Sequence, residues 1–266
     1  MTDWLYGRNA VQESLRAGRR TFRRLVVSSG AREAGPIASI LALAEQRRVV
    51  VERVAPRVLD EALPGTRHQG VALEAGPYPY ADLATCLEAA ARRSEPALLV
   101  MLDHVQDPQN VGTLLRTAET VGVHGVILPH RRAVEVTPAV VNASSGATEH
   151  LAIAMVGNLD QAIRTLQEGG VWVVGVEQDE RARPFDQADL TMPLALVVGA
   201  EGSGLARLTR ERCDFLVALP MRGLIASLNV AVAGSIVLYA AWRQRDSGHS
   251  SGHSGHSGHS GKGTRS

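Results

Sequence analysis

The stretch Leu196-Val197-Val198-Gly199-Ala200-Glu201-Gly202-Ser203-Gly204-Leu205 joins an apolar run to a loop with three glycines and one acid. The apolar run predicts a buried β-strand, and the glycines permit a ligand to approach the backbone closely. The GxxGxG spacing matches neither the GxGxxG fingerprint of dinucleotide-binding folds nor a phosphate-binding P-loop. Glu201 is either a helix-start residue favoured by the helix dipole or a group that binds a polar or cationic partner. A tight strand-to-helix turn without a ligand is the alternative to a binding loop.

Similar apolar runs alternate with helical patterns on both sides of this stretch. Strands are predicted at residues 97–102, 125–128, 171–176 and 194–198. Apolar strands that alternate with helices are typical of an α/β protein with a mostly parallel sheet. Such sheets bind ligands at the carboxyl ends of their strands, which is where the glycine loop is expected to lie.

Upstream, the segment from Asp103 to Gly112 follows a predicted strand and runs into an amphipathic helix. Asp107 or Asn110 is a candidate cap for that helix. At about 100° per residue, Asn110 and Arg116 share the polar side of the helix, opposite its apolar residues. We interpret this side as one wall of a cleft, and an ordinary solvent-exposed face is the alternative.

Downstream, residues 219–230 read LPMRGLIASLNV and lead into a helix that is apolar on nearly every side. We expect that helix, over residues 230–242, to be buried on nearly every side. Ser227 and Asn229 stand at its start. Capping of free N–H groups explains Ser227, whereas Asn229 is predicted to do more than cap, with a local helix-start role as the alternative.

The first 75 residues form a basic segment whose alternating helical and strand patterns predict a small α/β domain. They hold 12 arginines against 8 acidic residues, a net charge of +4, whereas the remainder holds 16 basic against 19 acidic residues, a net charge of −3. Clustered arginines can meet phosphate oxygens, although a solvated charged loop is the alternative. The arginines predicted to bind RNA are Arg8, Arg19, Arg20, Arg23 and Arg24.

Changes of composition divide the rest of the chain. Residues 76–96 contain Pro77 and Pro79 and are interpreted as a linker or lid, and residues 97–245 form the larger domain. Residues 246–266 are rich in Gly, Ser and His and are predicted to be a disordered tail. Its histidines could chelate a divalent ion weakly, but a specific metal site is not expected in a flexible tail. They are His249, His253, His256 and His259.

Several classes of protein are disfavoured by simple features of the sequence. No apolar run is long enough to span a bilayer, and the first residues lack the basic and apolar regions of a secretory signal, so we expect a cytoplasmic protein. Cys86 and Cys213 have neither a CxxC partner nor the spacing of zinc ligands. A hydrolase is disfavoured because no GxSxG elbow follows a predicted strand.

Together, the three segments resemble the SpoU family of ribose 2′-O-methyltransferases, within the SPOUT superfamily. NVGTLLRTAETVG from Asn110, LVVGAEGSGL from Leu196 and LPMRGLIASLNVAVAGSI from Leu219 stand in the order and spacing of the three motifs of that family. The opening LYGRNAVQESL from Leu5 resembles the small domain that binds substrate RNA in the ribosomal branch of the family. The resemblance covers nearly everything except the tail.

The resemblance implies a trefoil-knotted methyltransferase domain that binds S-adenosylmethionine and pairs into a homodimer. The catalytic positions that it implies are Asn110, Arg116, Glu201, Ser227 and Asn229. The cofactor contacts that it implies are Val198, Gly199, Leu219, Met221 and Leu228. No metal is required, because a sulfonium methyl is already activated and the enzyme must chiefly align the hydroxyl oxygen behind it.

Family proposals make the arginine at the position of Arg116 the acceptor of the hydroxyl proton. Arginine stays protonated in proteins, so we expect Arg116 to bind phosphate and stabilise the developing alkoxide while Asn110 orients the ribose. Phosphate or water then takes the proton. Within the family, the chain most resembles enzymes that methylate a guanosine of large-subunit (23S) ribosomal RNA. The alternatives are a transfer-RNA ribose methyltransferase, a drug-resistance methyltransferase acting on ribosomal RNA, and a non-catalytic RNA-binding protein.

Overall fold

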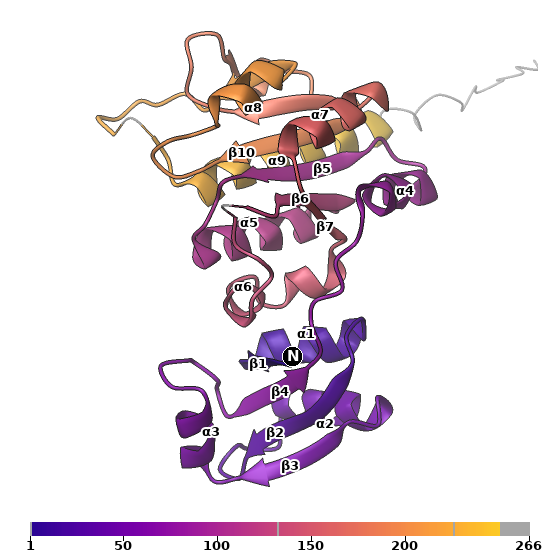
Figure 1. Ribbon diagram of the computed structural model, residues 1–266, viewed down its shortest axis with the longest axis vertical. Helices are drawn as coiled ribbons and strands as arrows, with labels where there is room; N and C mark the ends of the chain where they lie inside the picture. The colour runs from indigo at the N-terminus through magenta and orange to yellow at the C-terminus, as the bar shows by residue number, and fades with distance from the viewer. Residues whose placement is uncertain (1, 132, 226, 251–266) are drawn as a thin grey trace, which may run out of the picture.

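Two separate β-sheets organise the chain, one formed before residue 76 and the other after residue 97. The structure is a computed structural model that describes residues 2–131, 133–225 and 227–250. Figure 1 shows the two α/β domains stacked along the long axis of the molecule, with the first domain at the bottom.

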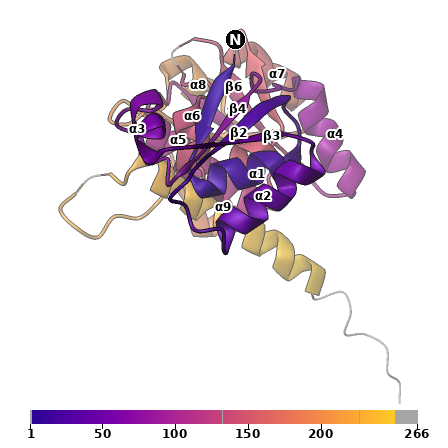
Figure 2. The same cartoon turned by 90° about the horizontal axis from the view of Figure 1, so that it is seen from below.

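The first domain has a four-stranded sheet with the order β1-β4-β2-β3, in which β2 and β3 are parallel and the other neighbours antiparallel. Helices α1 and α2 lie side by side on one face, and α3 covers the other (Figure 2). The alternation of helical and strand patterns predicted for this segment is present, with α1, β2, α2 and β3 following one another along the chain. The elements are β1 (Asp3–Tyr6), α1 (Arg8–Ala17), β2 (Phe22–Ser28), α2 (Pro36–Gln46), β3 (Val50–Val54), α3 (Pro56–Ala62) and β4 (Val71–Ala75).

The second domain has a seven-stranded sheet with the order β7-β6-β5-β10-β8-β11-β9, and all its described strand pairs are parallel. The parallel α/β architecture predicted from the apolar runs is therefore confirmed, whereas the knotted connection stays a prediction. The elements as far as β7 are α4 (Leu83–Arg93), β5 (Leu98–Asp103), α5 (Pro108–Thr120), β6 (Gly125–Pro129), α6 (Pro138–Ala143), η1 (Ala147–His150) and β7 (Ile153–Val156). The later elements are α7 (Leu159–Glu168), β8 (Trp172–Val176), β9 (Arg183–Pro184), η2 (Phe185–Gln187), β10 (Leu194–Gly199), α8 (Arg207–Arg212), β11 (Phe215–Ala218) and α9 (Val230–Ser250).

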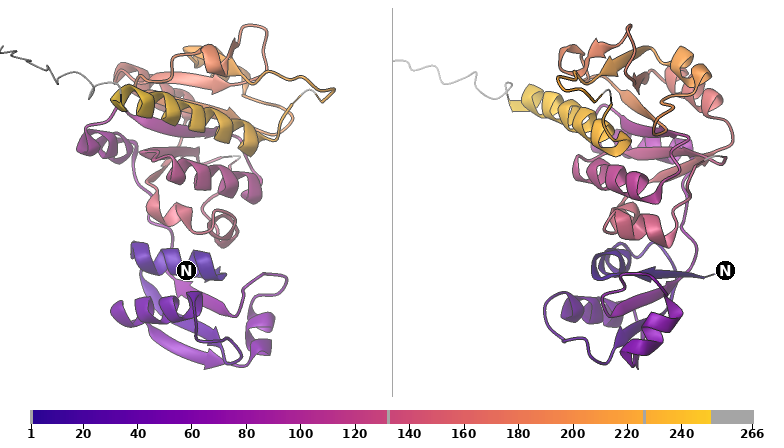
Figure 3. Two further views of the ribbon diagram at one scale, coloured as in Figure 1. Left: turned by 180° about the vertical axis from the view of Figure 1, so that it is seen from behind. Right: turned by 90° about the vertical axis from the view of Figure 1, so that its left-hand side faces the viewer.

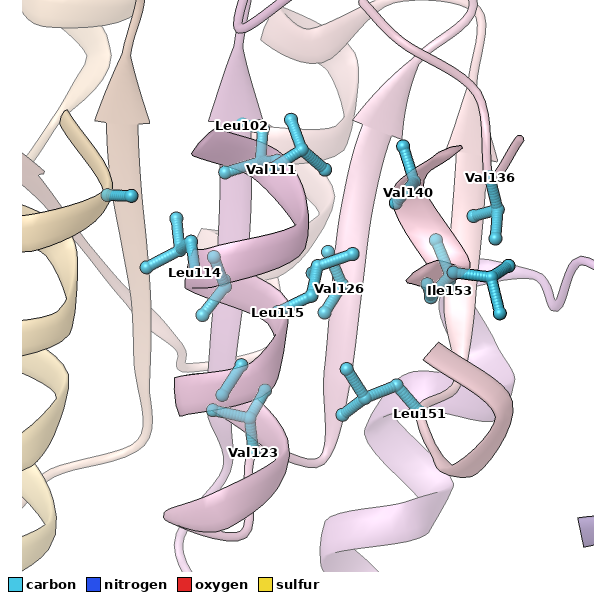
Figure 4. Close-up of a cluster of buried hydrophobic side chains, with 14 of the residues drawn as sticks. Leu102, Val111, Leu114, Leu115, Val123, Val126, Val136, Val140, Leu151 and Ile153 are labelled. Carbon is cyan, nitrogen blue, oxygen red and sulfur yellow. The ribbon is translucent and has the colours of Figure 1, made fainter. Parts of the chain in front are cut away.

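The large sheet is buried on both faces because its central strands are apolar at nearly every position. In β5, Leu98, Val100 and Leu102 pack with α5 and α9, while Leu99 and Met101 join the cluster on the α4 and α7 side. This alternation follows from the period of two in a strand. Figure 4 shows the first of these faces, where the apolar side of α5 lies over β5 and β6.

The two domains meet through a set of side chains that we call the interdomain contact: Arg19, Arg20, Tyr78 and Glu149. Nη2 of Arg20 lies 2.8 Å from Oε1 of Glu149, and both side chains are 0% exposed. The Tyr78 hydroxyl donates to the backbone carbonyls of Thr148 and Leu151, at 2.8 and 2.9 Å. The prediction that Arg20 binds RNA is therefore corrected, because its guanidinium is enclosed and already bonded inside the protein.

Two predicted segments differ from what the structure shows. Residues 76–96 are more than a connection, because α4 packs on β6 and β7 of the large sheet. The tail prediction began at residue 246, yet α9 runs to Ser250, and residues 251–266 lie outside the described part of the chain with His253, His256 and His259. Within the described residues, no helix is both long enough and apolar enough to cross a membrane.

Helix α9 also departs from its prediction of burial on nearly every side, because one whole side of it is exposed. It packs on α5 and β10 with one side (Figure 3, left). The other side exposes Val232, Ile236 and Tyr239 to 44, 37 and 48%. Their spacing of four and three residues puts them on one face of the helix. An apolar face of this kind on a single chain is a candidate contact surface.

Candidate active site

A cavity of about 500 Å³ opens at the carboxyl ends of β8, β10 and β11, beside the start of α9. We call it the glycine-lined cavity. This is the edge at which open parallel sheets bind their ligands, and the volume suits a small organic molecule. The cavity is lined by Val176, Glu177, Gln178, Val198, Gly199, Ala200, Glu201, Gly202, Gly204, Ala218, Leu219, Met221, Ser227, Leu228, Asn229, Val230 and Ala233.

The glycine loop after β10 folds back on itself, which brings backbone groups to the cavity wall. Ala200 and Gly204 exchange two backbone hydrogen bonds, at 3.0 and 2.9 Å. A Cβ on Gly199 would lie 2.3 Å from the carbonyl carbon of Gly204, so a larger residue requires the backbone to move. Gly204 has a φ of +64°, and a Cβ there would meet the Glu177 carboxylate at 2.4 Å. Gly199 is thus required by its close packing against backbone, and Gly204 by its left-handed conformation.

Three polar side chains meet at the mouth of this cavity, and we call them the polar cluster: Asn110, Glu201 and Asn229. Nδ2 of Asn110 donates to Oε2 of Glu201 at 3.1 Å. Nδ2 of Asn229 donates to Oδ1 of Asn110 at 2.8 Å and to Oε1 of Glu201 at 3.2 Å. Each carboxylate oxygen of Glu201 is therefore held by one amide, which fixes its direction. The structure brings together residues from all three sequence motifs.

Asn229 has a second task at the start of α9. Its Oδ1 accepts from the backbone N–H groups of Ala231 and Val232, at 2.9 and 3.3 Å, so it caps the helix. The cap that we expected at Ser227 is thus provided by Asn229, and Ser227 lines the cavity as an exposed residue. One amide serves both purposes because its oxygen faces the helix and its nitrogen faces Glu201.

Helix α5 is capped by Asp107, which accepts from the backbone N–H groups of Gln109 and Asn110, both at 3.2 Å. Asn110 is thereby free to point inward, where it is 9% exposed. Arg116 does not share its cleft. Six residues along a helix correspond to about 9 Å, and Arg116 lines another cleft, of about 450 Å³, between α5 and the first domain. There its Nη1 donates to Oγ of Ser145 at 3.2 Å.

All five predicted cofactor contacts line the glycine-lined cavity: Val198, Gly199, Leu219, Met221 and Leu228. The sequence analysis missed the residues that β8 and β11 contribute, namely Val176, Glu177, Gln178 and Ala218. Oε2 of Glu177 accepts from the backbone N–H of Leu205 at 2.7 Å and so supports the glycine loop. Its position directly after a predicted strand was the available signal, because carboxyl ends of parallel strands share one edge of the sheet.

The predicted RNA-binding arginines of the first domain have different surroundings. Arg23 is 72% exposed at its side chain and pairs with Glu74, and Arg24 pairs with Glu74 and Glu52. The hydrogen bond from Arg24 holds the pKa of Glu74 below its usual value. Arg8 donates to the Gln69 carbonyl at 3.3 Å. Arg20 is the one buried member of the set, whereas Arg8, Arg19, Arg23 and Arg24 reach the surface, Arg19 while also taking part in the interdomain contact.

Two family models match the chain. The model described as the SpoU rRNA Methylase family matches residues 97–239, which contain the glycine-lined cavity and the polar cluster. The model described as RNA 2′-O ribose methyltransferase substrate binding matches residues 4–81, which contain the first sheet. The two models therefore follow the two domains of the fold.

Similar proteins and structures cover almost the whole chain. A relative from Bacillus subtilis (strain 168), YacO, bears the name of a TrmH family tRNA/rRNA methyltransferase and is 38% identical over 244 residues, 92% of this chain and 96% of the relative. The SpoU methyltransferase AviRb from Streptomyces viridochromogenes, in complex with the cofactor AdoMet, has a TM-score of 0.76 at 26% identity, covering 92% of this chain and 90% of AviRb. An AdoMet-bound rRNA methyltransferase from Sinorhizobium meliloti has a TM-score of 0.73 at 26% identity, covering 91% and 87%.

Proposed function

Because the chain belongs to the SpoU rRNA methylase family, we propose that it methylates the ribose 2′-hydroxyl of a guanosine in 23S ribosomal RNA. It is an RNA ribose methyltransferase whose methyl donor is S-adenosylmethionine. The observation that carries the proposal is the polar cluster at the mouth of a cavity walled by backbone. The guanosine and the ribosomal substrate are our own step beyond family membership.

The residues of the glycine-lined cavity suit the methyl donor. Its volume of about 500 Å³ lies within the usual range for cofactor sites. We propose that backbone groups of Gly199, Leu219 and Leu228 hold it, and that Val198 and Met221 supply the apolar part of the wall. When bound, S-adenosylmethionine supplies a methyl group that its sulfonium has already activated. The protein must then orient the acceptor hydroxyl and exclude water.

We assign the polar cluster to that orientation. Glu201, held by two amides, presents a fixed negative charge to a positively charged donor. Asn110 and Asn229 share one hydrogen-bond network with Glu201, so a ribose that contacts Asn110 is aligned relative to the cavity. Ser227 adds a hydroxyl at the exposed rim. No side chain of the cluster is required to change its charge.

Arg116 supports the proposal that a second copy of the chain completes the site. It lies in a separate cleft of its own protomer, and the exposed face Val232, Ile236 and Tyr239 on α9 offers an apolar surface next to α5. We propose that two chains pair through this face and that Arg116 of each serves the cavity of its partner. There it binds RNA phosphate and stabilises the developing alkoxide, while phosphate or water accepts the proton.

The basic first domain favours ribosomal RNA as the substrate. It carries a net charge of +4 and matches a substrate-binding model of RNA ribose methyltransferases. A transfer-RNA substrate is the second candidate, because the Bacillus relative carries both tRNA and rRNA in its name. In either case we expect the enzyme to work in the cytoplasm, where these RNAs are made in bacteria.

The role of Arg116 is tested by replacing it. Arg116→Ala should lower the rate of methyl transfer by at least about 100-fold, the usual effect of removing a group that stabilises developing charge. Affinity for S-adenosylmethionine, measured by calorimetry, should stay within twofold of the parent. Arg92→Ala is the matched control, because Arg92 is an exposed arginine on the opposite layer. Turnover close to the parent in Arg116→Ala would contradict the assigned role.

The substrate is tested by mapping 2′-O-methylation in ribosomal and transfer RNA from a deletion strain. Loss of one guanosine methylation in 23S RNA supports the proposal. An unchanged ribosomal map with a lost transfer-RNA methylation assigns the second candidate instead.

Sedimentation of the parent and of Ile236→Glu tests the proposed pairing of two chains. A parent that stays monomeric at micromolar concentration contradicts it.

A further inference from the structure

One short segment, residues 142–151, runs from the last residues of α6 to just before β7 and carries much of the contact between the two domains, and we call it the docking segment. Nδ2 of Asn142 donates to the Tyr6 carbonyl at 3.0 Å. Glu149 forms the buried ion pair with Arg20, and Nε2 of His150 lies 2.9 Å from Oε2 of Glu13. Loops seldom combine so many fixed contacts unless their conformation matters.

Ser145 stands in the middle of this segment with an unusual backbone. Its φ is +55°, and Gly146 follows with a φ of +86°. A serine pays for the left-handed conformation, which persists only where the surroundings hold it. Backbone bonds from Ser145 to Asn142 and from Gly146 to Val141, at 2.9 and 2.8 Å, close the turn. The first domain supports it from outside, since a Cβ on Gly146 would lie 2.6 Å from Cβ of Glu13.

The strained turn presents the hydroxyl of Ser145 to Arg116. Oγ of Ser145 accepts from Nη1 of Arg116 at 3.2 Å. The helix that carries Arg116 is fixed against the same segment, because a Cβ on Gly112 would lie 2.4 Å from Cβ of Ala143. The close packing of α5 on α6 therefore fixes the backbone end of Arg116, and the hydroxyl of Ser145 binds its guanidinium end.

We propose that Ser145 is a positioning residue for methyl transfer: its hydroxyl, held by the strained turn that the first domain supports, orients the Arg116 guanidinium toward RNA. The inference rests on the proposed function in that Arg116 must take part in methylation. A long arginine samples many conformations when free, so a single acceptor that selects one of them raises the fraction of productive complexes. We therefore expect the transfer rate to depend on the hydroxyl of Ser145 rather than on the apolar packing of the docking segment.

The kinetic test compares three variants under single-turnover conditions with saturating RNA and S-adenosylmethionine. Ser145→Ala should lower the rate of transfer about tenfold, the effect of losing one charge-assisted hydrogen bond. Affinities for RNA and for the donor should stay within twofold. Ser145→Asn should recover most of the rate, because asparagine tolerates a positive φ and its amide oxygen can accept from Arg116. Ser94→Ala is the matched control, since Ser94 has a φ of +54° at the end of α4.

A second measurement does not depend on activity. With ¹⁵N-labelled arginine, the Nε order parameter of Arg116, assigned from Arg116→Lys, should fall in Ser145→Ala and stay at the parent value in Ser145→Asn. If the parent methylates no RNA, the proposed function fails while this order parameter still tests the contact. An unchanged order parameter, a transfer rate in Ser145→Ala equal to that of the parent, or an equal loss in Ser94→Ala overturns the inference.

Discussion

The glycine-lined cavity and the interdomain contact are both polar, but they use their polar groups in opposite ways. In the interdomain contact, the charges of Arg20 and Glu149 are fully buried and neutralise each other. In the cavity, Glu201 and Asn229 bond to each other and remain exposed to solvent. Polar groups that satisfy one another inside the protein hold it together, whereas fixed groups that still face a concave surface can bind a ligand.

The largest effect is expected from the interdomain contact. Glu149→Gln removes the fully buried counter-charge of Arg20 and leaves only the partly exposed Asp3 at 3.2 Å, which should lower the free energy of unfolding by up to about 3–5 kcal/mol. Denaturant unfolding measures this loss. Glu88→Gln, which breaks the exposed pair with Arg92, is the control and should cost at most about 1 kcal/mol.

A double replacement sharpens this first prediction. Arg20→Met with Glu149→Leu removes both charges and should recover most of the lost stability, because buried pairs can be exchanged for apolar residues. If Glu149→Gln unfolds with the same free energy as the parent, the contact does not stabilise the two-domain arrangement.

Gly199→Ala should weaken the binding of S-adenosylmethionine in the glycine-lined cavity. The new Cβ would lie 2.3 Å from the Gly204 backbone, so the glycine loop must shift. Affinity for S-adenosylmethionine, measured by calorimetry, should weaken roughly 10-fold to 100-fold, equivalent to about 1–3 kcal/mol of strain. Gly223→Ala is the matched control, since nothing lies within 4 Å of its added Cβ. Equal affinities in the two variants would show that the loop tolerates the change.

The two tasks of Asn229 can be separated. Asn229→Ala should cost about 1 kcal/mol of stability through the lost cap, and roughly tenfold in methyl transfer through the lost amide donors. Asn229→Ser keeps a capping oxygen, so thermal unfolding should return to near the parent while the transfer rate stays low. Full activity in Asn229→Ser would leave the amide with a capping role alone.

The smallest effect is a pH dependence of the interdomain contact. Burial raises the pKa of the Tyr78 phenol above its ordinary value of 10. Because the folded state favours the protonated phenol, its contribution to stability is complete below pH 10 and is lost as pH rises above it. Burial also raises the pKa of Tyr80, Cys86 and Cys213, so the contribution of Tyr78 is isolated by comparing the parent with Tyr78→Phe. Unfolding of Tyr78→Phe should therefore decline less between pH 9 and 11 than that of the parent, and parallel declines would argue against this linkage.

The comparison also shows why the sequence alone does not distinguish buried arginines from exposed ones. Arg20 and Arg116 both stand in predicted polar positions, and the sequence analysis assigned both to RNA. Arg20 finds Glu149 at a separation of 129 residues, whereas Arg116 finds the hydroxyl of Ser145 and stays exposed. Such pairings cannot be predicted from local sequence, because they depend on which distant segments the fold brings together.

The local sequence pattern determined the parallel sheet, because a strand that is apolar at successive positions needs both of its faces covered. The order of the three motifs determined the family. Tertiary structure decided that Asn110, Glu201 and Asn229 form one cluster, although up to 119 residues separate them. It also decided that Asn229 caps α9 and that one side of this apolar helix stays exposed. Periodicity records which residues are apolar over a few turns, whereas hydrogen bonds and exposure are set by the distant segments that pack against them.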